Sequence, residues 1–240
     1  MAEGRAAPYT LRPSSIADTR RRVAPAPPRS SNLLVKRILV GLGNPGPEYV
    51  GTRHNVGFEV LDRVALHEGL LFRSPASLIR SGALDGYGGE RSFLCARSFD
   101  PDVLLVKPTT FMNLSGEAVS PIVQWAGVTP ADVLVVYDDM DLPLGRLRMR
   151  PSGGHGGQNG MRSIIDALGS NLFPRLRIGI GRTSTDAARH VLSRFNDDER
   201  IEIDISVAEA AEAALDWLKS GDTEGCMTRF HSRWSHGADA

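Results

Sequence analysis

The sequence has few of the residues on which metal, redox or membrane chemistry depends. Only two of its 240 residues are cysteines, and they lie far apart, in no metal-binding or redox spacing. Four of the six histidines, His67, His190, His231 and His236, show no metal-ligand spacing either. No apolar run approaches the ~20 residues that cross a bilayer. We therefore expect a protein of a reducing compartment, with no membrane association and no metal.

Net charge is also absent, since 28 basic residues balance 28 acidic ones. The balance is uneven along the chain. Residues 1–36 hold seven basic and two acidic residues, which gives +5 there and −5 for the remainder. The overall field therefore does not favour nucleic acid, and any binding by the folded part needs a local basic patch.

Residues 1–31 lack apolar periodicity and are rich in Pro, Ser, Ala and Arg. This composition predicts a disordered, basic N-terminal tail. It also fits an organellar transit peptide, which is Arg-rich and poor in acids, but it lacks the apolar core of a secretory signal. We favour a plain tail and a cytoplasmic protein, with organellar import as the alternative.

From residue 33 onwards, short apolar runs alternate with segments of helical periodicity. The expected strands cover 36–42, 79–85, 90–97, 103–106, 133–137, 147–149 and 176–180. The expected helices cover 56–66, with Asn55 as its N-cap, and 116–126, 161–168, 187–195, 199–219 and 222–230. This alternation predicts one α/β domain over residues 33–235, with a mixed, mostly parallel twisted sheet and helices on both faces.

Ligands of open α/β sheets bind beyond the carboxyl ends of the strands. Three predicted loops meet this condition, at residues 41–55, 108–115 and 138–145, and the Gly-rich loop 153–160 joins them. His54 ends the first loop, and Asp138 follows a strand, where its carboxylate can accept an imidazole N–H and fix the tautomer. Convergence on one sheet edge favours a catalytic His54 over a structural one.

The first loop also contains the pattern G-x-G-x-x-G, at Gly41 to Gly46, which is typical of dinucleotide-binding folds. That fingerprint requires a helix directly after the glycines. Here Pro45 and Pro47 intervene, and helical periodicity begins almost ten residues later, so we disfavour this alternative. No G-x-S-x-G elbow occurs, which leaves a covalent serine mechanism without support.

Arginines alternate with apolar residues just before the Gly-rich loop, at Arg146, Arg148 and Arg150. In a strand they share one face, with Leu147 and Met149 on the other. A solvated edge would look the same, but arginines feeding into a loop with five glycines in eight residues favour a phosphate clamp.

Five segments, in order and spacing, closely resemble bacterial-type peptidyl-tRNA hydrolase: GLGNPGPEYVGTRHNVGFEVLD, KPTTFMNLSGEAV, YDDMDLPLG, GGHGGQNGMRSI and FPRLRIGIGR. The resemblance covers residues 36–232. It implies a monomeric, cofactor-free enzyme that cleaves the ester between a peptide and the terminal ribose of tRNA, releasing the tRNA for reuse after ribosomal drop-off.

The resemblance also implies roles for particular residues. His54 matches the catalytic histidine, Asp138 its supporting aspartate and Asn44 an active-site asparagine. The substrate-binding positions fall on Tyr49, Phe111, Asn113 and Asn159 for the peptide and acceptor end, and on Arg148 and Arg150 for the 5′-phosphate.

Two features depart from the pattern of many relatives. Arg148 and Arg150 stand where lysine is common, and Gln158 stands where some relatives have histidine. Some chloroplast relatives are intron-splicing factors that bind a protein partner, and the basic tail is compatible with such a role. The presence of the matching His, Asp and Asn residues favours the enzyme.

Overall fold

The structure, a computed structural model, describes residues 35–182 and 186–235, and the side chains up to residue 231. Six strands form one sheet in the order β2–β3–β1–β4–β6–β5. Their bounds are β1 Arg37–Gly41, β2 Phe93–Phe99, β3 Asp102–Pro108, β4 Val133–Asp139, β5 Leu147–Arg150 and β6 Arg175–Gly179. The disorder expected for residues 1–31 lies outside the described residues.

The four central strands, β3, β1, β4 and β6, are parallel, and the edge strands β2 and β5 run antiparallel to their neighbours. The central strand β4 is buried along its whole length, as expected for a strand covered on both faces. The predicted mixed, mostly parallel sheet is confirmed.

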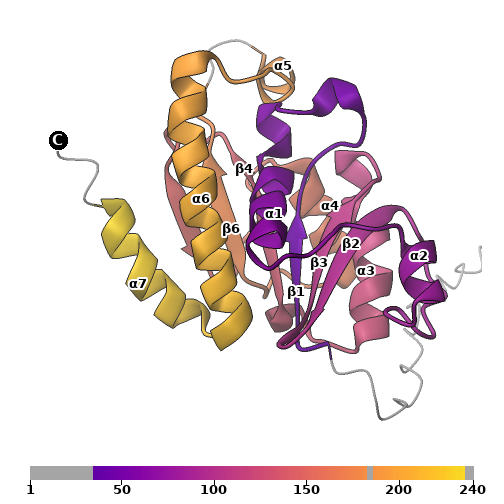
Figure 1. Cartoon of the computed structure of the whole chain (residues 1–240). Helices are drawn as coiled ribbons and strands as arrows, with labels where there is room; N and C mark the ends of the chain where they lie inside the picture. Colours follow the sequence, from indigo (N-terminus) through magenta and orange to yellow (C-terminus); the bar gives the residue numbers. More distant parts are fainter. Residues whose placement is uncertain (1–34, 183–185, 236–240) are drawn as a thin grey trace, which may run out of the picture.

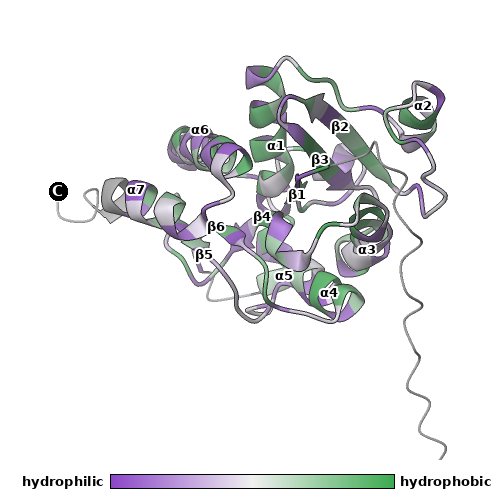
Figure 2. Ribbon diagram, turned by 90° about the horizontal axis from the view of Figure 1, so that it is seen from below, coloured by the Kyte–Doolittle hydropathy of each residue, from purple (hydrophilic) through white to green (hydrophobic). Residues whose placement is uncertain are grey.

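Helices cover both faces of this sheet (Figures 1 and 2). Helices α1 (Val56–His67) and α6 (Asp197–Ser220) pack on one face, and α3 (Ser115–Ala126) and α4 (Asn159–Leu168) on the other. Helix α2 (Pro75–Arg80) lies beside β2, and α7 (Thr223–Ser235) lies beside β5. Short helical segments complete the chain: η1 Pro47–Tyr49, η2 Arg53–Asn55, η3 Met112–Leu114, η4 Pro130–Asp132 and α5 Ala187–Val191.

Helices α3 and α4 pack closely because Gly116 has no side chain. A Cβ atom there would lie 2.1 Å from the carbonyl oxygen of Ser163. The backbone N–H of Gly116 instead donates to Ser163 Oγ at 2.9 Å. This contact sets the N-terminal end of α3 beside α4, at the sheet edge where the site residues gather.

Three expectations about local structure are wrong. Residues 79–85 form no strand. Helix α2 begins at Pro75, with Ser74 as its N-cap, and runs into this segment. Leu78, in the helix, and Leu84, in the turn after it, are buried there. The side chain of Asn55 does not cap α1, because its amide is bonded to the backbone of Asn44. The helix expected over 187–195 ends at Val191.

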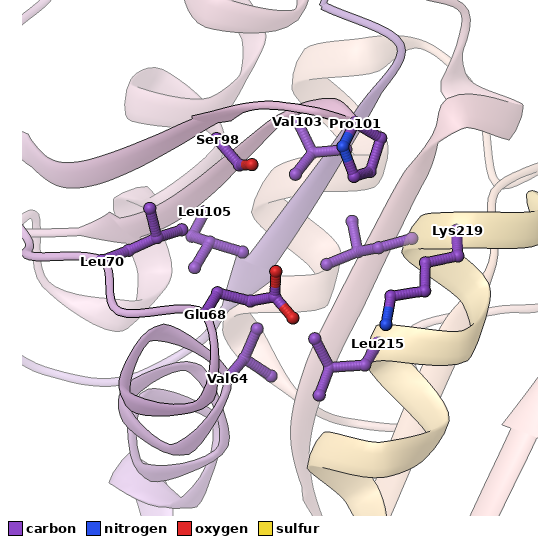
Figure 3. A pocket seen from close by; sticks show the side chains of 10 residues that line it. Val64, Glu68, Leu70, Ser98, Pro101, Val103, Leu105, Leu215 and Lys219 are labelled. Carbon is purple, nitrogen blue, oxygen red and sulfur yellow. The ribbon is translucent and has the colours of Figure 1, made fainter.

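A small apolar cavity of about 10 Å³ lies between α1, β3 and α6 (Figure 3). Apolar side chains from each of these elements face it, among them Val64, Leu105 and Leu215. Pro101 and Val103, at the amino end of β3, also line it, so it lies away from the carboxyl ends of the parallel strands. Its volume is about that of one water, and we regard it as a packing gap. Within the described part of the chain, no helix is long and apolar enough to cross a membrane.

Candidate active site

The centre of the site is a hydrogen bond between His54, in η2, and Asp138, near the end of β4. Nδ1 of His54 lies 2.8 Å from Oδ2 of Asp138. The aspartate is 2% exposed, while 11% of the histidine side chain remains accessible. Nε2 of the ring has no partner among the described residues. Because Asp138 occupies Nδ1, Nε2 carries the lone pair that can accept a proton.

The pKa of His54 follows from two opposed causes. Burial lowers it, and the negative charge of Asp138 and the hydrogen bond to it raise it. The net effect is a pKa above the ordinary 6.5. A histidine with this environment is a competent general base near neutral or slightly alkaline pH.

A cavity of about 240 Å³ opens beside this pair. Polar residues that line it include His54, Asp138, Gln158 and Asn159. Small or apolar residues also line it: Met140 and three residues of α5, Ala187, Ala188 and Val191. A reacting group therefore has room next to the imidazole, among both polar and apolar side chains.

Asn44 is held in place on both its backbone and its side chain. Its backbone N–H donates to Asn55 Oδ1 at 2.8 Å, and its carbonyl oxygen accepts from Asn55 Nδ2 at 3.0 Å. Its own Oδ1 accepts the backbone N–H of Met112 at 2.8 Å. The side-chain nitrogen of Asn44, Nδ2, is left as a donor that no described residue uses.

Gln158 joins Met112 to Asp138. Its Nε2 lies 3.1 Å from Asp138 Oδ1 and 3.2 Å from Met112 Sδ. Together these bonds form a closed ring, because Asn55 and His54 are consecutive residues: the ring runs from His54 through Asp138, Gln158, Met112 and Asn44 to Asn55. The sequence marked Gln158 only as a departure from relatives, and gave no sign that it bonds to the aspartate.

The remaining predicted residues surround this ring at different depths. Asn159 begins α4 and lines the cavity with its side chain exposed. Asn113 is exposed in η3, and Phe111, just before that segment, is 56% exposed. Tyr49 is half-buried in η1, and no side-chain hydrogen bond joins it to the pair among the described residues. These side chains are available to a ligand rather than to the fold.

Arg148 and Arg150 lie on one face of β5, opposite the buried Leu147 and Met149, as expected from the alternation. The neighbouring strand β6 contributes another arginine, Arg177, which the sequence analysis did not single out. Arg148 is directly opposite Arg177 of β6, and Arg177 forms an ion pair with Asp139, the residue after the site aspartate. Its alternation with Leu176 was the signal for it. The basic face is therefore linked to the end of β4 that carries Asp138.

No group of three His, Cys, Asp or Glu side chains within residues 35–182 and 186–235 is placed to hold a metal ion. The dinucleotide alternative has no structural basis, because α1 begins only at Val56 and does not follow Gly46 directly. The glycines of this loop therefore do not aim a helix N-terminus at a pyrophosphate.

Comparison with known proteins gives consistent matches. The sequence model of the peptidyl-tRNA hydrolase family matches residues 38–237. The chloroplastic peptidyl-tRNA hydrolase of Arabidopsis thaliana is 49% identical over 197 residues, which cover 81% of this chain and 64% of that protein. The enzyme of Synechococcus sp. strain JA-3-3Ab is 46% identical, with 81% of this chain and 82% of that protein covered. The crystal structure of peptidyl-tRNA hydrolase from Acinetobacter baumannii superposes with a TM-score of 0.71 at 30% identity, covering 83% of this chain and 96% of that one.

A single α/β domain with a histidine–aspartate pair at the carboxyl edge of its sheet, and these matches, define a hydrolase. The chain belongs to the peptidyl-tRNA hydrolase family.

Proposed function

We propose that this chain hydrolyses the ester between the peptide and the terminal ribose of peptidyl-tRNA, with a water molecule activated by His54. The observation that carries the proposal is the 2.8 Å bond between His54 and the buried Asp138, beside an open cavity. An ester is reactive enough for an activated water to suffice, so the chain's own residues can supply the chemistry.

In this mechanism Nε2 of His54 takes a proton from water as the oxygen attacks the ester carbonyl. A positioned general base of this kind contributes typically ~10²–10⁴-fold. Asp138 keeps the second ring nitrogen protonated and stabilises the imidazolium that forms. The imidazolium then returns its proton to the ribose oxygen as it leaves.

Carboxamides would stabilise the charge that develops on the carbonyl oxygen. The unused amide nitrogen of Asn44 is the donor we assign to this oxyanion, an interaction typically worth ~2.7–4 kcal/mol. We assign Asn113 and Asn159, both exposed at the site, to the peptide backbone. Tyr49 and Phe111 would contact the acceptor end or the peptide. Contacts to backbone rather than side chains suit an enzyme that must accept any peptide sequence.

The arginine face of β5 and β6 would bind the 5′-phosphate of the tRNA. Like charges directly opposite each other in a sheet repel, and Arg148 and Arg177 occupy such a position. Asp139 neutralises only one of them. A phosphate between Arg148, Arg150 and Arg177 would relieve this repulsion, and the planar guanidinium groups suit phosphate oxygens.

We further propose that the enzyme acts as a monomer in the cytoplasm. Both cysteines are unpaired and buried, which agrees with a reducing compartment. Sequencing the N-terminus of the mature protein would decide between a retained tail and a cleaved import signal.

The function is tested by product analysis. The purified chain, incubated with an N-acetylated aminoacyl-tRNA, should yield the free N-acetyl amino acid and a tRNA that can be aminoacylated again. A shortened tRNA, or an intact substrate at micromolar enzyme, would contradict the assignment.

A further inference from the structure

The position of Gln158 has a consequence for the basicity of the proposed catalytic histidine. The residue is 9% exposed and occupies the N-cap position of α4. Its Oε1 accepts the backbone N–H of Met161 at 2.8 Å. Because an N–H group must face an acceptor, this bond fixes the orientation of the amide, and the opposite atom, Nε2, must be the donor that faces Asp138.

On the side of Gly160, the amide is closely packed. Gly160 has no side chain, and a Cβ atom there would lie 2.5 Å from Met112 Sδ and 3.0 Å from Gln158 Oε1. Met112 accepts the contact from Nε2 on one side, at 3.2 Å, and Asp138 Oδ1 accepts on the other, at 3.1 Å. The amide is therefore held at both ends and has one arrangement.

Asp138 then has two side-chain partners and no others among the described residues. Oδ1 accepts from Gln158, and Oδ2 accepts from His54. A buried carboxylate distributes its charge over its donors, and each hydrogen bond to the charged form stabilises it.

We propose that Gln158 is a positioning residue: it donates to Oδ1 of Asp138, leaves Oδ2 for His54, and shares the negative charge that the imidazole would otherwise face alone. This inference rests on the role of His54 proposed above. Its consequence is that Gln158 limits how far Asp138 raises the pKa of His54, and so keeps more of the histidine in the neutral, basic form at a given pH.

Gln158→Asn separates positioning from helix capping. Asparagine is a preferred N-cap residue and can still accept the Met161 N–H. One methylene shorter, it cannot reach Asp138 at the same time. Gln158→Met keeps the length of the side chain but removes its hydrogen bonds to Asp138 and to the Met161 N–H. Gln124→Asn is the matched control, since Gln124 lies on α3 and donates to Ser120 Oγ at 3.3 Å, away from the site.

The primary measurement is the pKa of His54 from an NMR titration of its ring protons, assigned with His54→Ala. We expect Gln158→Asn and Gln158→Met both to raise this pKa by about 0.5–1 unit. Gln124→Asn should leave it unchanged. Other titratable groups at this end of the sheet, Asp139 paired with Arg177 and His190 bonded to Ile180 and Gly181, are the same in all variants.

The acid limb of kcat/KM against pH should move with the pKa of His54, with little change in KM. Melting temperature should fall in Gln158→Met, which loses the cap, and should hold in Gln158→Asn. An unchanged or lowered His54 pKa in Gln158→Asn would overturn the inference, as would a shift confined to the variant that loses stability. Because the titration needs no substrate, a failure of the proposed activity would be seen separately, as absent hydrolysis by the wild type.

Discussion

Arg53, the residue before His54, binds both carboxylate oxygens of Glu199 through one guanidinium nitrogen, at 2.9 and 2.7 Å. Its backbone N–H donates to the carbonyl oxygen of Ser193, and its guanidinium lies 4.6 Å from the ring centroid of Phe195. The turn that carries the histidine is thereby attached to the segment that starts α6. Two residues that are 146 positions apart in the sequence are therefore in contact next to His54.

We expect Glu199→Gln to lower the free energy of unfolding by about 2 kcal/mol, since it leaves a buried guanidinium without its counter-charge. The estimate is below that of a fully buried pair, because a quarter of the Glu199 side chain is exposed. Glutamine still suits the third position of the capping box with Asn196. Urea unfolding measures the change. Asp204→Asn removes an exposed partner of Arg200 on the same helix, and should cost less than about 1 kcal/mol. Equal costs for the two variants would count against a structural role for the Arg53 pair.

Asp138→Asn should change both the rate and its pH dependence. In the wild type, kcat/KM should fall as the pH drops through the raised pKa of His54, at a value above 6.5. Without the carboxylate only burial remains, and the pKa of His54 falls below 6.5. We therefore expect the acid limb to move to lower pH and the plateau rate to drop ~10²–10⁴-fold, because the tautomer is no longer fixed. If the acid limb of kcat/KM does not shift in Asp138→Asn, a group other than His54 controls the pH dependence.

The same pair affects stability with the opposite pH dependence. A histidine whose pKa is raised on folding contributes stability that is complete below its unfolded value, 6.5, and is lost as the pH rises through the folded value. If His54 is the general base, as proposed, we expect the ion pair to be weakest at the pH where hydrolysis is fastest.

The double variant Arg148→Ala with Arg150→Ala should raise KM and leave kcat near its wild-type value. Each lost phosphate contact should reduce the slope of log KM against log salt by roughly one. The matched control is Arg63→Ala, which removes an exposed arginine from α1. Removing the 5′-phosphate from the substrate should abolish the difference between the double variant and the wild type. A KM that is unchanged, or changed equally by Arg63→Ala, would discard the clamp.

The central strands of the sheet could be predicted from the sequence because they are continuous runs of apolar residues, which must be buried on both faces of a sheet. Val133 to Tyr137 is one such run, buried throughout β4. The error at residues 79–85 arose where the pattern is ambiguous. Leu78, Ala83 and Leu84 are all buried there, from a short helix and the turn after it, and a run of that length fits a strand equally well.

At the site, sequence reasoning paired His54 with Asp138 because strand ends converge on one edge. It could not predict the partner of the Asn55 side chain, which is bonded to the backbone of Asn44, eleven residues away, and does not cap α1. Nor could it place Gln158 on Asp138, since that bond depends on where α4 begins relative to β4. Bonds between side chains on different elements follow from packing, which a linear pattern does not contain.

The central claim, that His54 is the general base, is tested most directly by single-turnover hydrolysis of N-acetylated aminoacyl-tRNA by His54→Ala. We expect the rate to fall at least ~10²-fold at saturating enzyme, with the dissociation constant for tRNA unchanged. A rate within threefold of the wild type would contradict the account.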